Sequence, residues 1–292
     1  MTGNAQLRSG KGTRDENFPV ASWLINRRHR PVILAFYEFV RTADDIADHP
    51  NLGGDEKLAR LDRLEATLLG NNGDEPEGVT LREMLAKREL SPQHTQDLLR
   101  AFRQDVTKNR YANWDELLDY CTYSAMPVGR FVLDVHGEAR TTWPASDALC
   151  AALQLINHLQ DCAADYRNLD RVYIPLDALA TRRLNVEALG DKQASPELRD
   201  CLRALAARTA ILFEQSRGLP ASVSDTRLAV EISTIQALAD RLLGILQVHD
   251  PLAERVHLSK VAGFATATNG AVRGLARRLL RMSTPAQRYQ TP

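Results

Sequence analysis

Residues Phe36–Asp48 read F-Y-E-F-V-R-T-A-D-D-I-A-D, and this stretch combines a helical apolar pattern with a stripe of charged side chains. At ~100° per residue, Tyr37, Arg41, Asp44 and Asp48 fall within about 60° of one another on a helix. Two carboxylates spaced i and i+4 repel each other and weaken a helix. The pattern therefore predicts a helix whose acidic face needs a compensating cation.

A second stretch, Gln154–Asp165, repeats this arrangement with the letters Q-L-I-N-H-L-Q-D-C-A-A-D. Gln154, Asn157, Asp161 and Asp165 share one stripe of a helix that is otherwise largely apolar. The stretch itself contains no Lys or Arg, and carboxylates buried in such a helix must be paired or bound to metal. Ligands that are all oxygen favour Mg²⁺ over zinc.

Two acidic stripes of this kind suit a diphosphate substrate. Mg²⁺ typically bridges a few carboxylates to substrate phosphates, and metal ions neutralise the charge of a departing diphosphate. The sequence therefore predicts cleavage of a carbon–oxygen bond that leaves a carbocation. The alternative from another class is a catalytically idle helical protein that scaffolds a neighbouring enzyme, and the intact aspartates argue against it.

Apolar residues return every three or four positions through almost the whole chain, which predicts an all-α protein. No composition shift marks a linker, so we expect one domain over residues 16–282, a disordered lead-in at 1–15 and a tail at 283–292. Pro127 lies within an expected long helix, where it either kinks that helix or marks a boundary between two. Helices are expected over 19–25, 31–48, 56–69, 79–87, 92–106, 114–135, 145–166, 197–215, 226–248 and 258–282.

The composition limits the class of protein. Lys+Arg and Asp+Glu are both 37, and this balance argues against a nucleic-acid partner. The four cysteines show no C-x-x-C spacing of a zinc or redox site. The N-terminus lacks the apolar core of a signal peptide, and no apolar run approaches the roughly 20 residues that span a bilayer. We therefore expect a cytoplasmic protein.

Four motifs, taken in order, resemble the squalene/phytoene synthase family over most of the chain, from about Glu16 to Phe264. The family fold is a single-domain isoprenoid synthase helical bundle around a central cavity, and the resemblance implies that fold here. The matching pieces are Y-E-F-V-R-T-A-D-D-I-A-D at 37–48, Y-C-T-Y-S-A-M-P-V-G-R at 120–130, L-Q-L-I-N-H-L-Q-D-C-A-A-D at 153–165 and R-V-Y-I-P at 171–175.

The resemblance also implies roles for individual residues. Tyr123 matches the tyrosine that assists diphosphate departure or proton removal in squalene synthase, and it joins Arg41 and the aspartates of both stripes as a catalytic candidate. The implied metal ligands are Asp44, Asp45, Asp48, Asn157, Asp161 and Asp165. The implied substrate contacts are Tyr37, Arg41, Gln154, Gln160, Arg171 and Tyr173.

Two stretches resemble one bacterial branch in particular, the hydroxysqualene synthases. They are E-N-F-P-V-A-S at 16–22 and S-A-M-P-V-G-R at 124–130. That branch ionises presqualene diphosphate, rearranges the cation and captures it with water, as part of squalene and hopanoid synthesis. The resemblance implies Mg²⁺, with Mn²⁺ as the alternative ion, no NAD(P)H, and functional coupling to other enzymes of the pathway.

The alternative within the family is the head-to-head condensation of two prenyl diphosphates. Two departures from the family pattern weaken this alternative. Gln160 stands where many members carry arginine before the second aspartate motif, and Ser124-Ala125-Met126 replaces the common Val-Ala-Gly. Fewer cationic contacts suit an enzyme that holds one diphosphate at a time.

Residues 271–282 read A-V-R-G-L-A-R-R-L-L-R-M and predict a basic amphipathic helix. One interpretation is peripheral docking on the inner face of the membrane; the other is an ordinary packing helix with a solvated face.

Two further residues have no role in the motif assignments. His158 is expected to be a hydrogen-bonded core residue, and Asp105 either supports the cavity or forms a solvated salt bridge.

Overall fold

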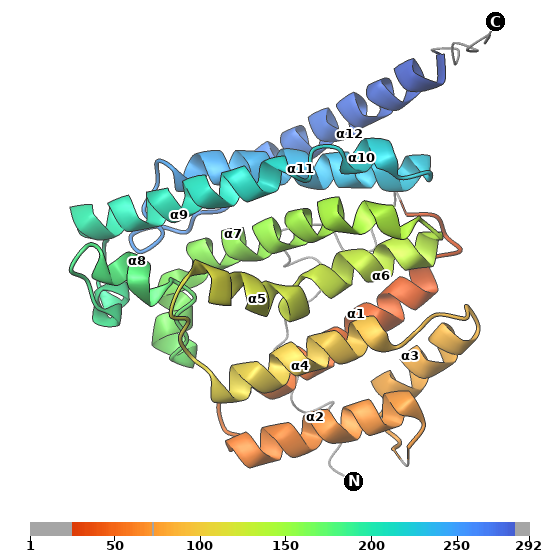
Figure 1. Cartoon of the computed structure of the whole chain (residues 1–292), viewed down its shortest axis with the longest axis horizontal. Coiled ribbons are helices and arrows are strands. Elements are labelled where there is room, and N and C mark those ends of the chain that lie inside the picture. Colours follow the sequence, from red (N-terminus) through yellow and green to blue (C-terminus); the bar gives the residue numbers. More distant parts are fainter. Residues whose placement is uncertain (1–24, 72, 284–292) are drawn as a thin grey trace, which may run out of the picture.

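The computed structural model describes residues 25–71 and 73–283, and apart from one isolated β-bridge the regular structure in that part of the chain is helical. The all-α prediction is thereby confirmed. The long helices, labelled in Figure 1, are α1 (Arg30–Asp48), α2 (Gly54–Leu69), α3 (Pro76–Ala86), α4 (Gln93–Thr107), α5 (Trp114–Ser124), α6 (Met126–His136), α7 (Trp143–Leu169), α9 (Pro196–Glu214), α11 (Thr226–Leu246) and α12 (Lys260–Ser283).

Most of the predicted helices agree with the structure to within three residues at each end. The expected helix at 19–25 lies outside the described residues except for Ile25. Four short elements were not predicted, because a single turn is too short to show an apolar period. They are η2 (Arg140–Thr142), α8 (Leu176–Ala180), η3 (Val186–Gly190) and α10 (Leu219–Ser222).

The single helix expected over 114–135 is wrong, because the chain breaks there into α5 and α6. Ala125 leaves the helical region with φ −132° and ψ −48°, and Pro127 occupies the first turn of α6. Proline suits this position, since the first turn of a helix has no use for its missing N–H. Of the two interpretations of Pro127, the helix boundary is confirmed.

The break lets α6 approach α7 closely. A Cβ added at Gly129 would lie 2.6 Å from Cys150 Sγ and closer still to Ser146 Oγ, so only glycine fits between the two helices. The same three residues line the central cavity. The close approach therefore fixes part of the cavity wall.

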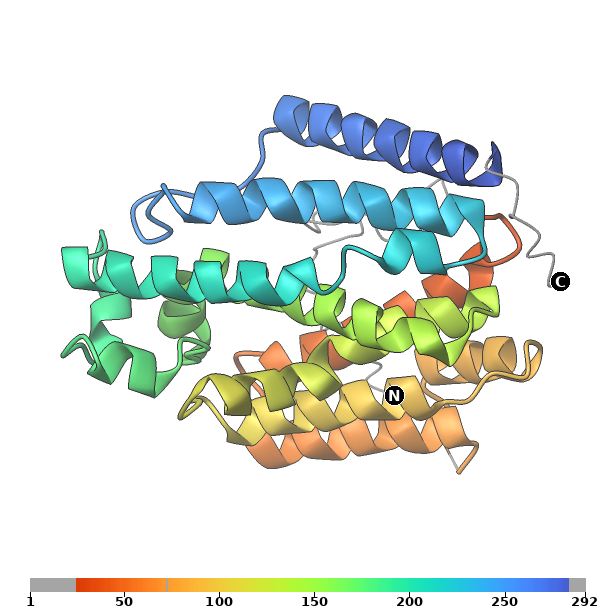
Figure 2. The ribbon, with the colours of Figure 1, turned by 45° about the horizontal axis from the view of Figure 1, so that its top comes forward.

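Two apolar clusters hold the bundle together. One is built mainly from α5, α7, α9 and α11, and the other from α1 to α4 with two residues of α6. Phe36 of α1 stacks on Phe131 of α6 with ring centroids 3.8 Å apart, which joins the lower helices of Figure 1 to the middle layer. Seen from a second direction in Figure 2, α11 covers α7, and α12 lies beyond α11 as the outermost helix.

Candidate active site

A cavity of about 530 Å³ runs between these layers. Its walls come from α1, α4, α5, α6, α7, α10 and α11, together with the segment that follows α7. Helices distant in sequence thus contribute side chains to a single space. The expected central cavity of an isoprenoid synthase bundle is present.

The two acidic stripes meet at this cavity. Asp44 and Asp48 reach it from the last turns of α1, and Asp161 and Asp165 reach it from the last turns of α7. The sequence predicted that the second pair would be buried, and here the prediction is wrong. Asp161 is exposed and Asp165 is half-buried, because this part of α7 lines an open space.

Asp44 shows the electrostatic consequence of this crowding. Its side chain is 41% accessible, but the space that it faces lies inside the bundle. Removal from bulk water, followed by repulsion from Asp48, raises the pKa of Asp44 to about 7, although Arg41 opposes the shift. A cation bound between these carboxylates would offset their mutual repulsion.

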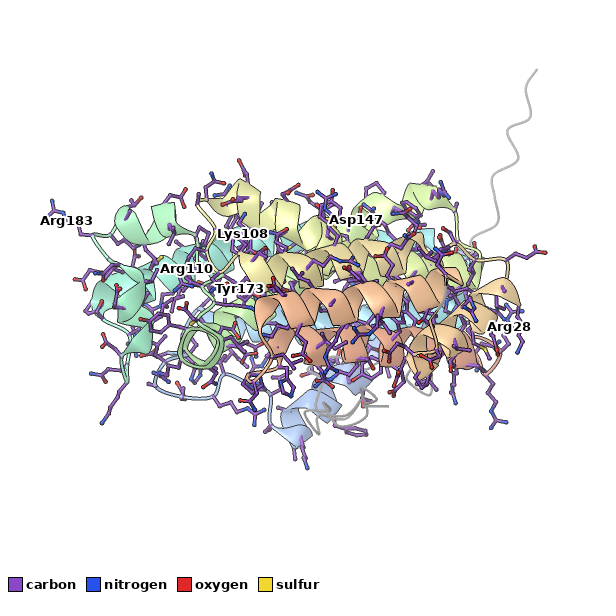
Figure 3. The ribbon with its side chains drawn as sticks, turned by 90° about the horizontal axis from the view of Figure 1, so that it is seen from below. Arg28, Lys108, Arg110, Asp147, Tyr173 and Arg183 are labelled. Atoms are coloured by element: carbon purple, nitrogen blue, oxygen red, sulfur yellow. The ribbon has the colours of Figure 1, made fainter. Side chains whose placement is uncertain are left out.

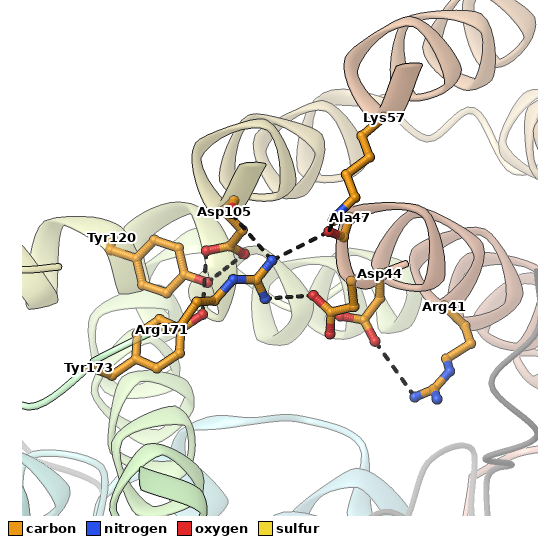
Figure 4. A network of polar contacts seen from close by, with 9 residues as sticks. Arg41, Asp44, Ala47, Lys57, Asp105, Tyr120, Arg171 and Tyr173 are labelled. Carbon is orange, nitrogen blue, oxygen red and sulfur yellow. Dashed lines mark hydrogen bonds and ion pairs between the residues drawn. The ribbon is translucent and has the colours of Figure 1, made fainter. Parts of the chain in front are cut away.

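Arg171 ties the acidic end of the cavity together. This buried side chain donates from Nη1 to Asp48 Oδ1 at 2.5 Å, and Nη2 reaches the main-chain oxygens of Ala47 at 3.5 Å and Asp105 at 3.3 Å (Figure 4). Lys57 Nζ also donates to Ala47 O, at 2.8 Å. One arginine therefore links the segment after α7 to the C-terminal ends of both α1 and α4.

Asp105 of α4 belongs to the same network and accepts hydrogen bonds from two tyrosines. Its Oδ2 accepts a hydrogen bond from Tyr120 Oη at 2.9 Å, and its Oδ1 accepts one from Tyr173 Oη at 3.4 Å (Figure 4). Burial raises the pKa of Asp105 to about 6, against the opposing effects of Arg171 and the tyrosine hydroxyls. Of the two roles left open for Asp105, the structure shows it lining the cavity.

This shift predicts a pH-dependent stability that Asp105→Asn should remove. A carboxyl with a pKa near 6 when folded and about 4 when unfolded holds a proton longer in the folded state. The protonated carboxyl therefore contributes about 3 kcal/mol to the free energy of unfolding below pH 4. This contribution is lost as the pH rises through 6. Denaturant titrations at pH 4 and pH 7 should show the variant gaining stability relative to the parent at the higher pH. An unchanged difference between the two proteins would contradict the shift.

Most of the residues implied by the family resemblance lie at the cavity. In addition to the four aspartates, its lining includes Tyr37, Arg41, Gln154, Asn157, Arg171 and Tyr173. Asp45, Gln160 and Tyr123 are not among the lining residues. What each of the lining residues binds stays a prediction.

Asp45, Gln160 and Tyr123, which do not line the cavity, contact other parts of the protein. Asp45 is buried and lies 3.6 Å from Arg41 Nε. Gln160 is buried and donates its side-chain amide to Val256 O. The Tyr123 ring packs under the Arg100 guanidinium at 3.9 Å. The structure therefore places Asp45 and Gln160 outside the cavity lining, and their implied roles as metal ligand and substrate contact stay predictions.

Tyr120, three residues earlier on α5, lines the cavity, and it is therefore a second candidate for the catalytic role that the resemblance implies for Tyr123. At ~100° per residue, Tyr120 and Ser124 lie about 40° apart on the helix, and both line the cavity. Tyr123 lies about 100° from Ser124 and is not among the lining residues. We expect Tyr120→Phe to lower turnover at least about tenfold, because it removes the hydroxyl that joins Asp105. Tyr123→Phe, assayed in parallel, should stay within about twofold of the parent. The reverse order would restore Tyr123 as the candidate.

The rest of the cavity is mainly apolar. Its lining includes Phe36 and Ile33 of α1, Leu149 and Leu153 of α7, and Ile232 of α11. Figure 3 shows Tyr173, at the polar end, and Arg28, beside the N-terminal end of α1, in opposite halves of the molecule. The acidic residues of the cavity thus come from the C-terminal turns of α1 and α7, and most of its other walls are apolar.

One carboxylate stands within the apolar walls. Glu231 of α11 is 3% exposed and lines the cavity one residue before Ile232. Sequence reasoning did not find it, since a single acidic residue in an apolar helix has no motif of its own. His158 also lines the cavity, where it stacks on Tyr173 with ring centroids 3.6 Å apart, and burial lowers its pKa to about 3.

A second group of potential metal ligands lies elsewhere. His29, His136 and Asp225 place donor atoms within 4.8 Å of one another. Both ring nitrogens of His29 already face arginines, with Arg28 Nε at 2.9 Å and Arg88 Nη2 at 2.6 Å. Two guanidinium groups at these distances repel a dication, so the aspartates of α1 and α7 are the better candidates.

The comparisons with known proteins agree with this geometry. The family model described as squalene/phytoene synthase matches residues 12–262. The chain belongs to the squalene/phytoene synthase family. Two curated relatives are hydroxysqualene synthases: the one from Rhodopseudomonas palustris is 60% identical over 93% of each chain, and that from Sinorhizobium fredii is 56% identical over 89% of each.

A solved structure shares both fold and sequence. The squalene synthase from Alicyclobacillus acidocaldarius is 30% identical, with a TM-score of 0.70 over 82% of this chain and 90% of that one. Family membership confirms the isoprenoid synthase fold expected from the motifs. Among the described helices, none is both long and apolar enough to cross a membrane. The expected domain bounds stay a prediction, because both outer segments lie outside the described residues.

Proposed function

We propose that the protein converts presqualene diphosphate to hydroxysqualene. The observation that carries the proposal is a single cavity that joins two aspartate pairs at one end to long apolar walls. A diphosphate headgroup suits the charged end and a hydrocarbon of about thirty carbons suits the walls. The hydroxysqualene synthases that are 56–60% identical to this chain support the same choice of substrate.

The charged end is built to hold a diphosphate. Asp44, Asp48, Asp161 and Asp165, with the amide of Asn157, offer a set of oxygen ligands of the kind that Mg²⁺ prefers. Mg²⁺ bound there would neutralise the charge that develops on the departing diphosphate. Arg171 lines the same space and can hold phosphate oxygens directly with its guanidinium.

Ionisation breaks the bond between carbon and the diphosphate oxygen, and the electron pair leaves with that oxygen. The cyclopropylcarbinyl cation then rearranges along the apolar walls, which shield it from bulk water. Water adds at the rearranged carbon and must lose a proton to give the alcohol. Glu231 is the carboxylate that lines the apolar part of the cavity, and we assign it the acceptance of this proton.

Glu231→Gln tests this assignment through the product. Without the carboxylate, the cation should still form, but it should lose a proton to become a hydrocarbon more often than it gains water. We expect the ratio of alcohol to hydrocarbon to fall at least about tenfold. Glu38→Gln, at an exposed glutamate of α1, is the control and should keep the parent ratio. An unchanged ratio in Glu231→Gln would remove Glu231 from the mechanism.

The function itself is tested by product analysis. Purified protein with Mg²⁺ is given presqualene diphosphate or farnesyl diphosphate, and the products are identified by mass. We expect presqualene diphosphate to disappear and an alcohol to form without NADPH. Consumption of farnesyl diphosphate alone would show that the assignment is wrong.

The second candidate is the condensation of two prenyl diphosphates. It is favoured by the 30% identity to a squalene synthase whose structure this fold matches. The same incubation separates the two, because condensation of farnesyl diphosphate gives a cyclopropyl diphosphate or a hydrocarbon. Neither product contains the hydroxyl group of hydroxysqualene.

A further inference from the structure

The face that α12 turns toward the protein is made of small residues. Gly270 and Gly274 are buried against α11, where a Cβ at Gly270 would lie 2.8 Å from Ala237 Cβ and one at Gly274 would lie 2.6 Å from Ser233 Oγ. Arg278 also contributes, since Nη1 donates to Val223 O at 3.0 Å. The helix therefore needs none of its large apolar side chains to pack on α11.

Those large side chains point the other way. At ~100° per residue, five of them fall within about 80° of one another, on the side opposite the buried glycines. We call these five the α12 ridge: Val261 is 81% exposed, Phe264 75%, Val272 62%, Leu275 45% and Leu279 55%. In both Figure 1 and Figure 2, no other labelled helix lies beyond α12 on its outer side. Such a long exposed apolar ridge marks an interaction surface.

The charge around the ridge has one sign. Residues 255–292 contain seven Lys or Arg and no Asp or Glu, although the whole chain has a net charge of zero. On the helix, Lys260 and Arg278 lie about 40° from one edge of the ridge, and the exposed Arg273 lies about 100° from the other edge. An apolar ridge with basic side chains and no acidic ones on its own helix is the pattern of a helix that lies in the plane of a membrane interface.

We propose that α12 docks this protein on an anionic phospholipid surface. The ridge inserts among the acyl chains near the headgroups, and the arginines contact the phosphates. One straight helix side of this kind matches a flat, deformable apolar layer bordered by negative charge. α12 does pack on α11, but through its small residues, so this packing leaves the large apolar side chains on the opposite face. This inference stands apart from the proposed function, since it uses none of the cavity residues.

The proposal is tested by sedimentation of the full chain with vesicles. We expect it to sediment with vesicles of phosphatidylcholine and 30% phosphatidylglycerol, and at least tenfold more weakly with phosphatidylcholine alone or in 1 M salt. The double variant Val272→Ser/Leu279→Ser should reduce binding to the anionic vesicles at least tenfold. Lys260→Gln/Arg273→Gln should also weaken that binding. Circular dichroism and thermal melting confirm that each variant is folded.

A matched control is Ile211→Ser, which replaces a 70% exposed residue of α9 and should bind vesicles like the parent. Equal binding by the ridge variant and the parent would overturn the proposal. So would the absence of binding to anionic vesicles. If the parent proves to be a dimer that the ridge variant dissociates while vesicle binding is unchanged, the ridge contacts a second copy and the proposal is wrong.

Discussion

Replacing Asp161 with Asn is expected to lower turnover at least about 100-fold while the protein stays folded. The carboxylate lines the cavity at the end of α7, and its loss removes an anionic ligand from the site where the diphosphate is held. The side chain is exposed, so the amide costs little in stability. Turnover is measured at saturating substrate and Mg²⁺, with circular dichroism for helical content.

Asp119→Asn is the control for this change. Asp119 is an exposed aspartate of α5 outside the cavity, and its amide variant should keep the parent rate. If Asp161→Asn works at the parent rate, Asp161 is not needed to hold the diphosphate, and the proposed metal site on α7 is wrong.

Arg171→Met is expected to lower both stability and turnover. The variant loses the ion pair with Asp48 and the contacts of Arg171 with the carbonyls of Ala47 and Asp105, although Lys57 still donates to Ala47 O. Because the Asp48 side chain is 34% exposed, solvent offsets part of the loss, and we expect about 2–3 kcal/mol less free energy of unfolding. Turnover should fall at least about tenfold, since the guanidinium also faces the diphosphate site.

The matched control is Arg110→Met, in the segment that lies beside Arg171. Arg110 pairs at 2.6 Å with Asp170, whose side chain is 70% exposed. Exposed pairs of this kind contribute about 1 kcal/mol or less, so this variant should melt close to the parent. Denaturant unfolding of both variants gives the comparison. Equal losses of unfolding free energy in the two variants would mean that the contacts of Arg171 contribute no more than an exposed ion pair does.

The helical periodicity was enough to predict the class of fold and most helix boundaries. It also predicted that Asp44 and Asp48 share one helix face and that Asp161 and Asp165 share another. Periodicity within one helix cannot place two helices relative to each other, and only the structure shows both faces at one cavity. The short helices α8, η3 and α10 depend on packing against their neighbours, so the helical periodicity does not predict them.

The choice between Tyr120 and Tyr123 could not be made from the sequence. The motif at 120–130 contains two tyrosines, and the letters alone do not say which one faces the cavity. In the structure, Tyr120 and Ser124 line the cavity, and Tyr123 is not among the lining residues. Glu231 was missed because its importance comes from the cavity beside it and not from its neighbours in sequence.

The C-terminal helix shows a different limit. The sequence divides 271–282 into an apolar arc and a basic arc, and an apolar arc normally packs inward. Here Gly270 and Gly274 lie against α11 and leave Val272 and Leu279 outside. The side chains of residues 281–283, including Arg281 and Met282 of the predicted arcs, lie outside the described part of the structure.

The aspartates of α1 and α7 are proposed to share divalent cations with a diphosphate. The most direct measurement is a crystal structure grown with Mn²⁺ and inorganic diphosphate, in which anomalous scattering locates the metal. We predict anomalous peaks between the Asp44/Asp48 and Asp161/Asp165 pairs, with the diphosphate beside Arg171. Manganese found only elsewhere, such as at His29 and His136, would contradict the claim.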